Sequence, residues 1–82
     1  MKVTLLYFAG LRDLVAQERE EFVLPEDVAT VMDFLAHLEG TKGALTGRLG
    51  SVRVAMDEEF VPADTKLVPG CVLALIPPVS GG

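Results

Sequence analysis

Two short apolar runs, one near each end of the chain, most constrain what it can fold into. Residues 2–8 are rich in β-branched and aromatic types, and residues 71–76 are six apolar residues without a break. Runs of this length with little polar alternation are typical of strands that are buried on both faces. Two such strands are expected to lie side by side at the centre of a sheet, and a long crossover would let them pair in parallel.

The segment after the first run predicts a short helix and a second strand. Leu11, Leu14 and Val15 recur at helical spacing and predict a helix of about two turns. Residues 20–24 then have the composition of a strand, which Pro25 stops.

The middle of the chain carries the clearest helical pattern. Thr30 is placed as the N-cap, with Asp33 three residues later in the position of a capping box. The helix is expected to continue to about Glu39, with Gly40 as its terminator. Its apolar stripe has the i, i+3, i+4, i+7 spacing of an amphipathic helix and consists of Val31, Phe34, Leu35 and Leu38.

The second half predicts a glycine-rich loop followed by strands. Residues 40–50 contain three glycines after Gly40 and are expected to form a loop with one turn around residues 44–49. Residues 51–56 alternate, with Val52, Val54 and Met56 on one face and Arg53 and Ala55 on the other. A turn at residues 57–59 leads into a short strand at residues 60–61, and the dipeptide 69–70 is a Pro-Gly turn before the last strand.

This order of elements predicts an α+β fold: a four- to five-stranded mixed sheet packed on one main helix. Such an arrangement is a β-grasp, or ubiquitin-like, roll. At 82 residues the chain is expected to form one domain, residues 1–76, followed by a flexible C-terminal tail, residues 77–82. Half of the residues are hydrophobic and 23% are charged, a composition that excludes intrinsic disorder.

The charge balance restricts the classes of partner. Seven Lys and Arg residues against twelve Asp and Glu residues give a net charge of −5. This charge repels phosphate backbones and anionic lipids, so we expect neither nucleic acid nor a membrane surface as a partner. A basic patch on another protein is the natural complement. A single cysteine excludes an internal disulfide, and we expect a cytoplasmic protein.

The folded part of the sequence offers no convincing catalytic set. His37 is the only histidine and lies beside the apolar stripe of the predicted helix, so it is interpreted as a surface residue. Cys71 begins the last strand with no neighbour that would lower its pKa, and is interpreted as an inert core or strand-end cysteine. The three acidic residues 57–59 surround a turn and do not converge as metal ligands should, so no bound metal or cofactor is expected.

The C-terminal residues are the most informative for function. Gly81 and Gly82 end the chain, a pairing expected by chance in about 1 sequence in 200. Pro77 and Pro78 favour an extended exit from the last strand. A slim tail of this kind could enter a narrow channel and present its carboxylate for activation by a partner. A frayed tail of small residues without a function is the alternative.

Several stretches resemble the small subunits of molybdopterin synthase, a family of ubiquitin-like sulfur carriers. The resemblance lies in residues 7–14, 52–61, 64–67 and 74–82. Its most specific part is the ending formed by Pro77, Pro78, Val79, Ser80, Gly81 and Gly82. Two departures are Asp57, where relatives usually have Asn, and the turn at residues 69–71.

The resemblance implies a carrier that is not an enzyme alone. A ubiquitin-activating-enzyme-like adenylyltransferase would use ATP to adenylate Gly82, and a sulfur donor protein would then convert it to a thiocarboxylate. Residues 77–81 would carry Gly82 into the active site of the large synthase subunit, whose side chains perform the catalysis. There the thiocarboxylate would give sulfur to cyclic pyranopterin monophosphate during molybdenum cofactor biosynthesis. A heterotetramer of two small and two large subunits is implied.

The resemblance also implies a docking surface. Phe8, Phe60 and Ile76 match the family's apolar contact positions, and Arg12 matches a basic position beside them. From the residues alone, Phe8 and Phe60 could equally belong to the core.

Three other functions remain open from the sequence. The same fold and ending serve sulfur carriers for thiamin synthesis and tRNA thiolation. A ubiquitin-like protein modifier, linked through Gly82 to lysines, is a second possibility. A plain interaction module with an inert tail is a third.

Overall fold

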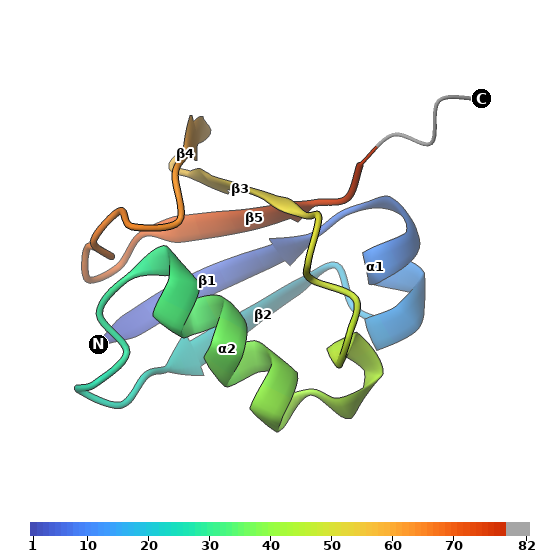
Figure 1. Ribbon diagram of the computed structural model, residues 1–82, viewed down its shortest axis with the longest axis horizontal. Helices are drawn as coiled ribbons and strands as arrows, with labels where there is room; N and C mark the ends of the chain where they lie inside the picture. Colours follow the sequence, from blue (N-terminus) through green and yellow to red (C-terminus); the bar gives the residue numbers. More distant parts are fainter. Residues whose placement is uncertain (79–82) are drawn as a thin grey trace.

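The two apolar runs form adjacent parallel strands in the centre of a sheet. In the computed structural model, which describes residues 1–78, they are β1 (Lys2–Tyr7) and β5 (Val72–Ile76). Their register pairs Thr4 with Val72 and Tyr7 with Leu75. The predicted parallel pairing is confirmed (Figure 1).

The sheet has five strands in the order β2-β1-β5-β3-β4. Strand β2 (Arg19–Val23) pairs antiparallel with β1, and β3 (Arg53–Met56) pairs antiparallel with β5. Strand β4 (Glu59–Val61) forms the far edge through its antiparallel pairing with β3. This mixed sheet and its main helix confirm the predicted ubiquitin-like roll.

The main helix, α2 (Val31–Thr41), begins with the predicted capping box. Thr30 Oγ1 accepts a hydrogen bond from the Asp33 backbone N–H at 3.2 Å, and the Asp33 carboxylate accepts one from the Thr30 N–H at 3.0 Å. The prediction that Gly40 terminates this helix is wrong. Helical bonding continues past it, because the Lys42 N–H still reaches the Leu38 carbonyl at 2.7 Å.

Two shorter helical pieces close the end of the domain. Helix α1 (Ala9–Val15) follows β1 and buries Leu11, and the 3₁₀ turn η1 (Gly43–Leu45) follows α2. The predicted loop at residues 40–50 is therefore partly helical. It also contributes Leu45 and Leu49 to the core, so two buried leucines lie among its glycines.

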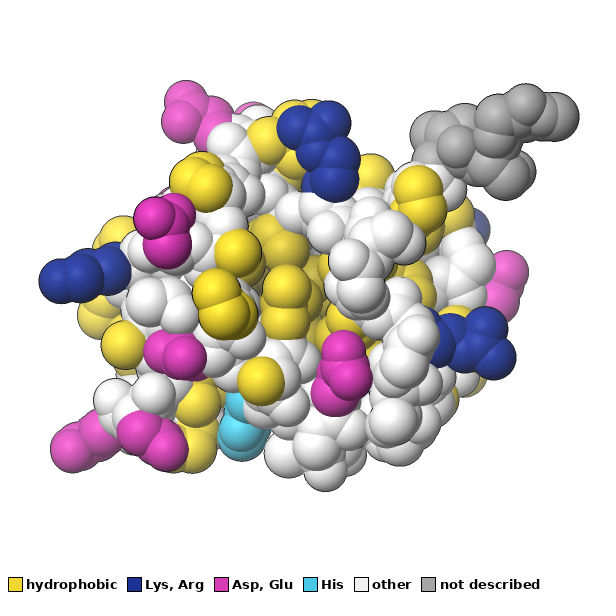
Figure 2. All heavy atoms as spheres, viewed as in Figure 1, with side chains coloured by type: hydrophobic (Ala, Val, Ile, Leu, Met, Phe, Trp, Pro, Cys, Tyr) yellow, Lys and Arg dark blue, Asp and Glu magenta, His cyan; other side chains and the backbone are white. Residues whose placement is uncertain are grey.

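The hydrophobic core lies on one side of the sheet. The face of β1 that carries Val3, Leu5 and Tyr7 clusters with the buried residues of all three helical pieces, including Phe34 at 0% exposure. Figure 1 shows α2 across this side. Viewed from the same direction, acidic side chains are spread among hydrophobic ones over the surface (Figure 2). None of the helices formed by residues 1–78 is long and apolar enough to cross a membrane.

The prediction that β1 and β5 are buried on both faces is wrong. On the second face Leu6, Ala74 and Ile76 are half-buried, and Val72 is exposed. The reason is that α1, α2 and η1 all contribute their buried side chains to the opposite face, which leaves this one without a covering layer. The sheet therefore has an apolar open face.

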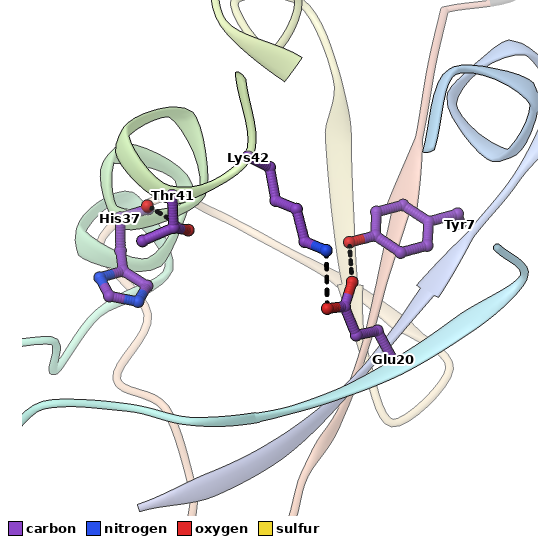
Figure 3. A network of polar contacts seen from close by, with 5 residues as sticks. All are labelled: Tyr7, Glu20, His37, Thr41 and Lys42. Carbon is purple, nitrogen blue, oxygen red and sulfur yellow. Dashed lines mark hydrogen bonds and ion pairs between the residues drawn. The ribbon is translucent and has the colours of Figure 1, made fainter. Parts of the chain in front are cut away.

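A polar cluster joins the core side of the sheet to the end of α2 (Figure 3). The Tyr7 hydroxyl donates to Glu20 Oε1 at 3.0 Å, and Lys42 Nζ lies 2.7 Å from Glu20 Oε2. Burial, followed by the bond to Glu20, raises the pKa of Tyr7 far above its usual value. The phenol therefore stays a donor, and the cluster holds β1, β2 and the end of α2 together.

Candidate functional site

The open face of the sheet carries an apolar groove of about 550 Å³. Side chains from four segments line it, chiefly Leu6, Phe8, Phe60, Val72, Ala74 and Ile76. They share this face because side chains at alternate strand positions point to the same side of a sheet. Hydrophobic surface that is gathered in a groove, rather than scattered, is typical of a protein-binding site.

Three of the predicted docking residues lie in this groove. Phe8 and Phe60 are 44% and 52% exposed, and Ile76 is half-buried between them in the lining. The alternative in which Phe8 and Phe60 belong to the core is therefore wrong. Both rings line the open groove.

Arg12, the fourth predicted residue, lies in α1 and does not line the groove. It is exposed, and its Nη1 atom is 3.6 Å from Glu18 Oε1. It stands four residues after Phe8, so the two lie about one helical turn apart at the same end of the sheet.

The chain leaves the sheet at that end. Leu75 pairs with Tyr7, and in a parallel pair both strands end at the same edge, so Ile76 emerges beside Phe8. Pro77 is half-buried and Pro78 is exposed. The predicted tail residues Val79, Ser80, Gly81 and Gly82 lie outside the described residues.

The opposite end of the groove is acidic. Asp57 and Glu58 form the two-residue turn between β3 and β4, with φ values of +49° and +73°. Asp57 Oδ1 accepts a hydrogen bond from the Val72 N–H at 2.9 Å, and the Asp57 N–H donates to the Val72 carbonyl at 2.8 Å. These two bonds fix the turn against the start of β5, at the end of the groove away from Ile76.

Sequence reasoning missed Leu6, Val72 and Ala74, which it placed in strands buried on both faces. It also missed Arg53, the basic residue beside the groove. Its guanidinium carbon lies 3.9 Å from the centroid of the Phe60 ring, which is the geometry of a cation–π contact. The alternation of residues 51–56 had already placed Arg53 and Ala55 on the same face. To place Arg53 beside Phe60 one needs the β3–β4 register. That register cannot be read from the sequence.

The other candidate residues lie elsewhere. Cys71 is buried, and burial raises its pKa, which fits the predicted inert cysteine. His37 is half-buried on α2 rather than fully solvated, and its ring points away from the Tyr7 cluster (Figure 3). Among residues 1–78, no three His, Cys, Asp or Glu side chains are grouped closely enough to hold a metal ion.

The roll, the apolar groove and the strand that ends beside it define a ubiquitin-like protein with an exposed apolar groove on its open sheet face. Residues 5–82 match the sequence pattern of the ThiS family, so the chain belongs to that family.

Similar proteins come from both sequence and structure. The molybdopterin synthase sulfur carrier subunit of Haemophilus influenzae is 32% identical over 82 residues, which span 98% of this chain and 99% of the relative. The crystal structure of SAMP1 from Haloferax volcanii has a TM-score of 0.85 at 28% identity and covers all of both chains. One chain in a complex of subunits 1 and 2 of the molybdopterin-converting factor from Helicobacter pylori has a TM-score of 0.71 at 25% identity. The match covers all of this chain and all of that one.

Proposed function

We propose that this chain is the sulfur-carrier subunit of a molybdopterin synthase and holds sulfur as a thiocarboxylate on Gly82. One observation carries the proposal: the apolar groove lies directly beside the point where β5 ends and the Pro77-Pro78 segment begins. A protein that covers this groove would receive the tail at its edge. The homologous carrier subunit of Haemophilus influenzae supports the same function.

The chemistry starts at the C-terminal carboxylate. A free α-carboxyl group has a pKa of about 3.5, so it is ionised in the cell and resists nucleophiles. A ubiquitin-activating-enzyme-like adenylyltransferase would join it to the α-phosphate of ATP, with release of pyrophosphate. A sulfide equivalent from a sulfur donor protein would then attack the glycyl carbonyl carbon and displace AMP. The product is the thiocarboxylate.

The delivery step belongs to a second partner, the large subunit of the synthase. Gly82 is six residues beyond Ile76, so an extended tail reaches at most about 20 Å from the groove. Docking at the groove would thus place the thiocarboxylate inside the large subunit's active site, where it would donate sulfur to cyclic pyranopterin monophosphate. The carrier contributes the tail and the docking surface, and the catalytic side chains lie in the partner. ATP-dependent activation and a free Cys71 thiol suit a cytoplasmic setting.

The intact mass of the protein tests this proposal. The full chain is incubated with ATP, its matched adenylyltransferase and sulfide, and a gain of about 16 Da at Gly82 is expected, because one oxygen is replaced by sulfur. Adding the large subunit and cyclic pyranopterin monophosphate should return the mass to its original value as molybdopterin appears. An unchanged mass with active partners would contradict carrier chemistry.

A protein modifier is the second candidate, favoured by the likeness to SAMP1, which is a small archaeal modifier protein. In that case the adenylated Gly82 would be attacked by lysine amines, and conjugates with many cellular proteins would form. Immunoblots of host lysates separate the two candidates, since a dedicated carrier gives no ladder of conjugates. Carriers for thiamin synthesis or tRNA thiolation would load in the same way but would fail to convert the pyranopterin.

A further inference from the structure

The guanidinium of Arg53 lies over the Phe60 ring at the edge of the groove. It stacks on Phe60 at 3.9 Å from the ring centroid, and Phe60 itself lines the groove. Stacking on an aromatic face uses the planar surface of the guanidinium and leaves its N–H donors directed outward. The stack therefore presents a donor fork of defined orientation.

This cation has no counter-ion among the described residues. The ion pairs within residues 1–78 involve Lys2, Arg12 and Lys42, and Arg53 is in none of them. Its side chain is exposed on a protein whose net charge is −5. An isolated, preoriented guanidinium is suited to a carboxylate, which it can bind through two parallel hydrogen bonds.

The position of Arg53 relates it to the tail. Arg53 pairs with Ile76, the last residue of β5, so the two side chains lie next to each other on the open face. The acidic turn at Asp57 lies at the other end of β5, beside Val72. The groove thus has a basic end where the tail leaves and an acidic end away from it.

We infer that Arg53 is a positioning residue for the docked complex: it binds a carboxylate that the partner carries at the entrance to its tail channel. The inference rests on the proposed function. The charge difference between the two ends of the groove would make the reversed orientation unfavourable, because like charges would then face each other. Its strand partner Ile76 is six residues before Gly82, so Arg53 acts on orientation and affinity and does not touch the reacting carbonyl.

Binding measurements on the full chain test this role. The affinity of the wild-type protein for the matched large subunit is measured by calorimetry at low and high salt. It is compared with Arg53→Ala, Arg53→Glu and Arg53→Lys. Arg48→Glu is the control, because Arg48 is also exposed and undergoes the same change of charge, but within residues 1–78 it makes no cation–π contact with a groove residue.

We expect Arg53→Ala to weaken binding about tenfold and Arg53→Glu about a hundredfold. Arg53→Lys should restore part of the loss, since it keeps the charge and loses the planar stack. Arg53→Ala should also reduce the salt dependence of the affinity, which a purely structural role would leave unchanged. Thermal unfolding of each variant establishes that binding is compared between folded proteins.

Equal affinities for Arg53→Glu and Arg48→Glu would overturn the inference while the proposed function stands. A salt dependence unchanged in Arg53→Ala would overturn it as well. If the wild-type protein neither binds the large subunit nor gains sulfur, the proposed function has failed, and the role of Arg53 fails with it. The wild-type measurement distinguishes these two cases before any variant is examined.

Discussion

The substitution Phe60→Ala should damage docking much more than folding. Burying a whole Phe side chain stabilises a protein by about 1.5–3 kcal/mol, and Phe60 remains 52% exposed, so truncation should lose about half of that. The lost contact with Arg53 adds about 0.5–1 kcal/mol. We therefore expect a total loss of about 1.3–2.5 kcal/mol in the free energy of unfolding.

Phe34→Ala is the matched control within the same chain. Phe34 is completely buried, and truncation of a buried Phe costs about 3–5 kcal/mol. Thermal unfolding followed by circular dichroism measures both variants. In a domain of this size each kcal/mol lowers the Tm by about 4–8 °C, so the two variants should be clearly separated.

The second measurement is the affinity of the folded Phe60→Ala protein for the large synthase subunit. Loss of an aromatic hot spot costs 2 kcal/mol or more, so the affinity should fall by about thirtyfold or more. Unchanged affinity would show that the groove is not the docking surface. A loss of stability as large as that of Phe34→Ala would show that the Phe60 ring is part of the core, against the open-face assignment.

Three further outcomes follow from the structure. Glu58→Gly should increase the free energy of unfolding by about 1 kcal/mol, because Glu58 has a φ of +73° that glycine adopts without strain. Urea unfolding measures this as a higher midpoint concentration, and a lower midpoint would contradict it. Hydrogen bonds from the backbone N–H groups of Ala29 and Thr30 lower the pKa of Asp33. The stability that they provide is complete above the unfolded-state pKa of about 3.9 and is lost as the pH falls through the lower folded-state pKa. The Tm of Asp33→Asn should thus change less with pH below about pH 4 than the wild-type Tm does, and parallel curves would refute this. Gly81→Ala should slow sulfur loading or transfer, measured by intact mass, because the added methyl group widens the tail. Its Tm should stay the same, since the core lies within residues 3–75, and normal transfer would contradict the slim-tail reasoning.

Local signals in the sequence predicted those elements whose ends are set by neighbouring residues. The Thr30–Asp33 capping box marks a helix start because both of its hydrogen bonds lie within four residues. Gly40 failed as a stop signal because glycine permits a helix end without requiring one, and the bond from Lys42 to Leu38 continues the helix.

The core contribution of residues 40–50 could not be predicted in the same way. Leu45 and Leu49 belong to one core cluster with buried residues of β1, α1 and β5, which are distant in sequence. Local hydrophobic periodicity does not reveal such contacts. The glycines around these leucines therefore led to the prediction of a loop.

The sequence by itself determined the strand order along the chain, the parallel central pair, the main helix and the residues Phe8, Phe60 and Ile76 as candidates. These follow from hydrophobic runs, capping and a family resemblance, all of which are local or direct properties of the chain. Tertiary structure alone decided that the second face of β1 and β5 is open. An apolar run has the same pattern whether its second face is covered by its own chain or left for a partner. The stacking of Arg53 on Phe60 likewise depends on the β3–β4 register, which exists only once the sheet has formed.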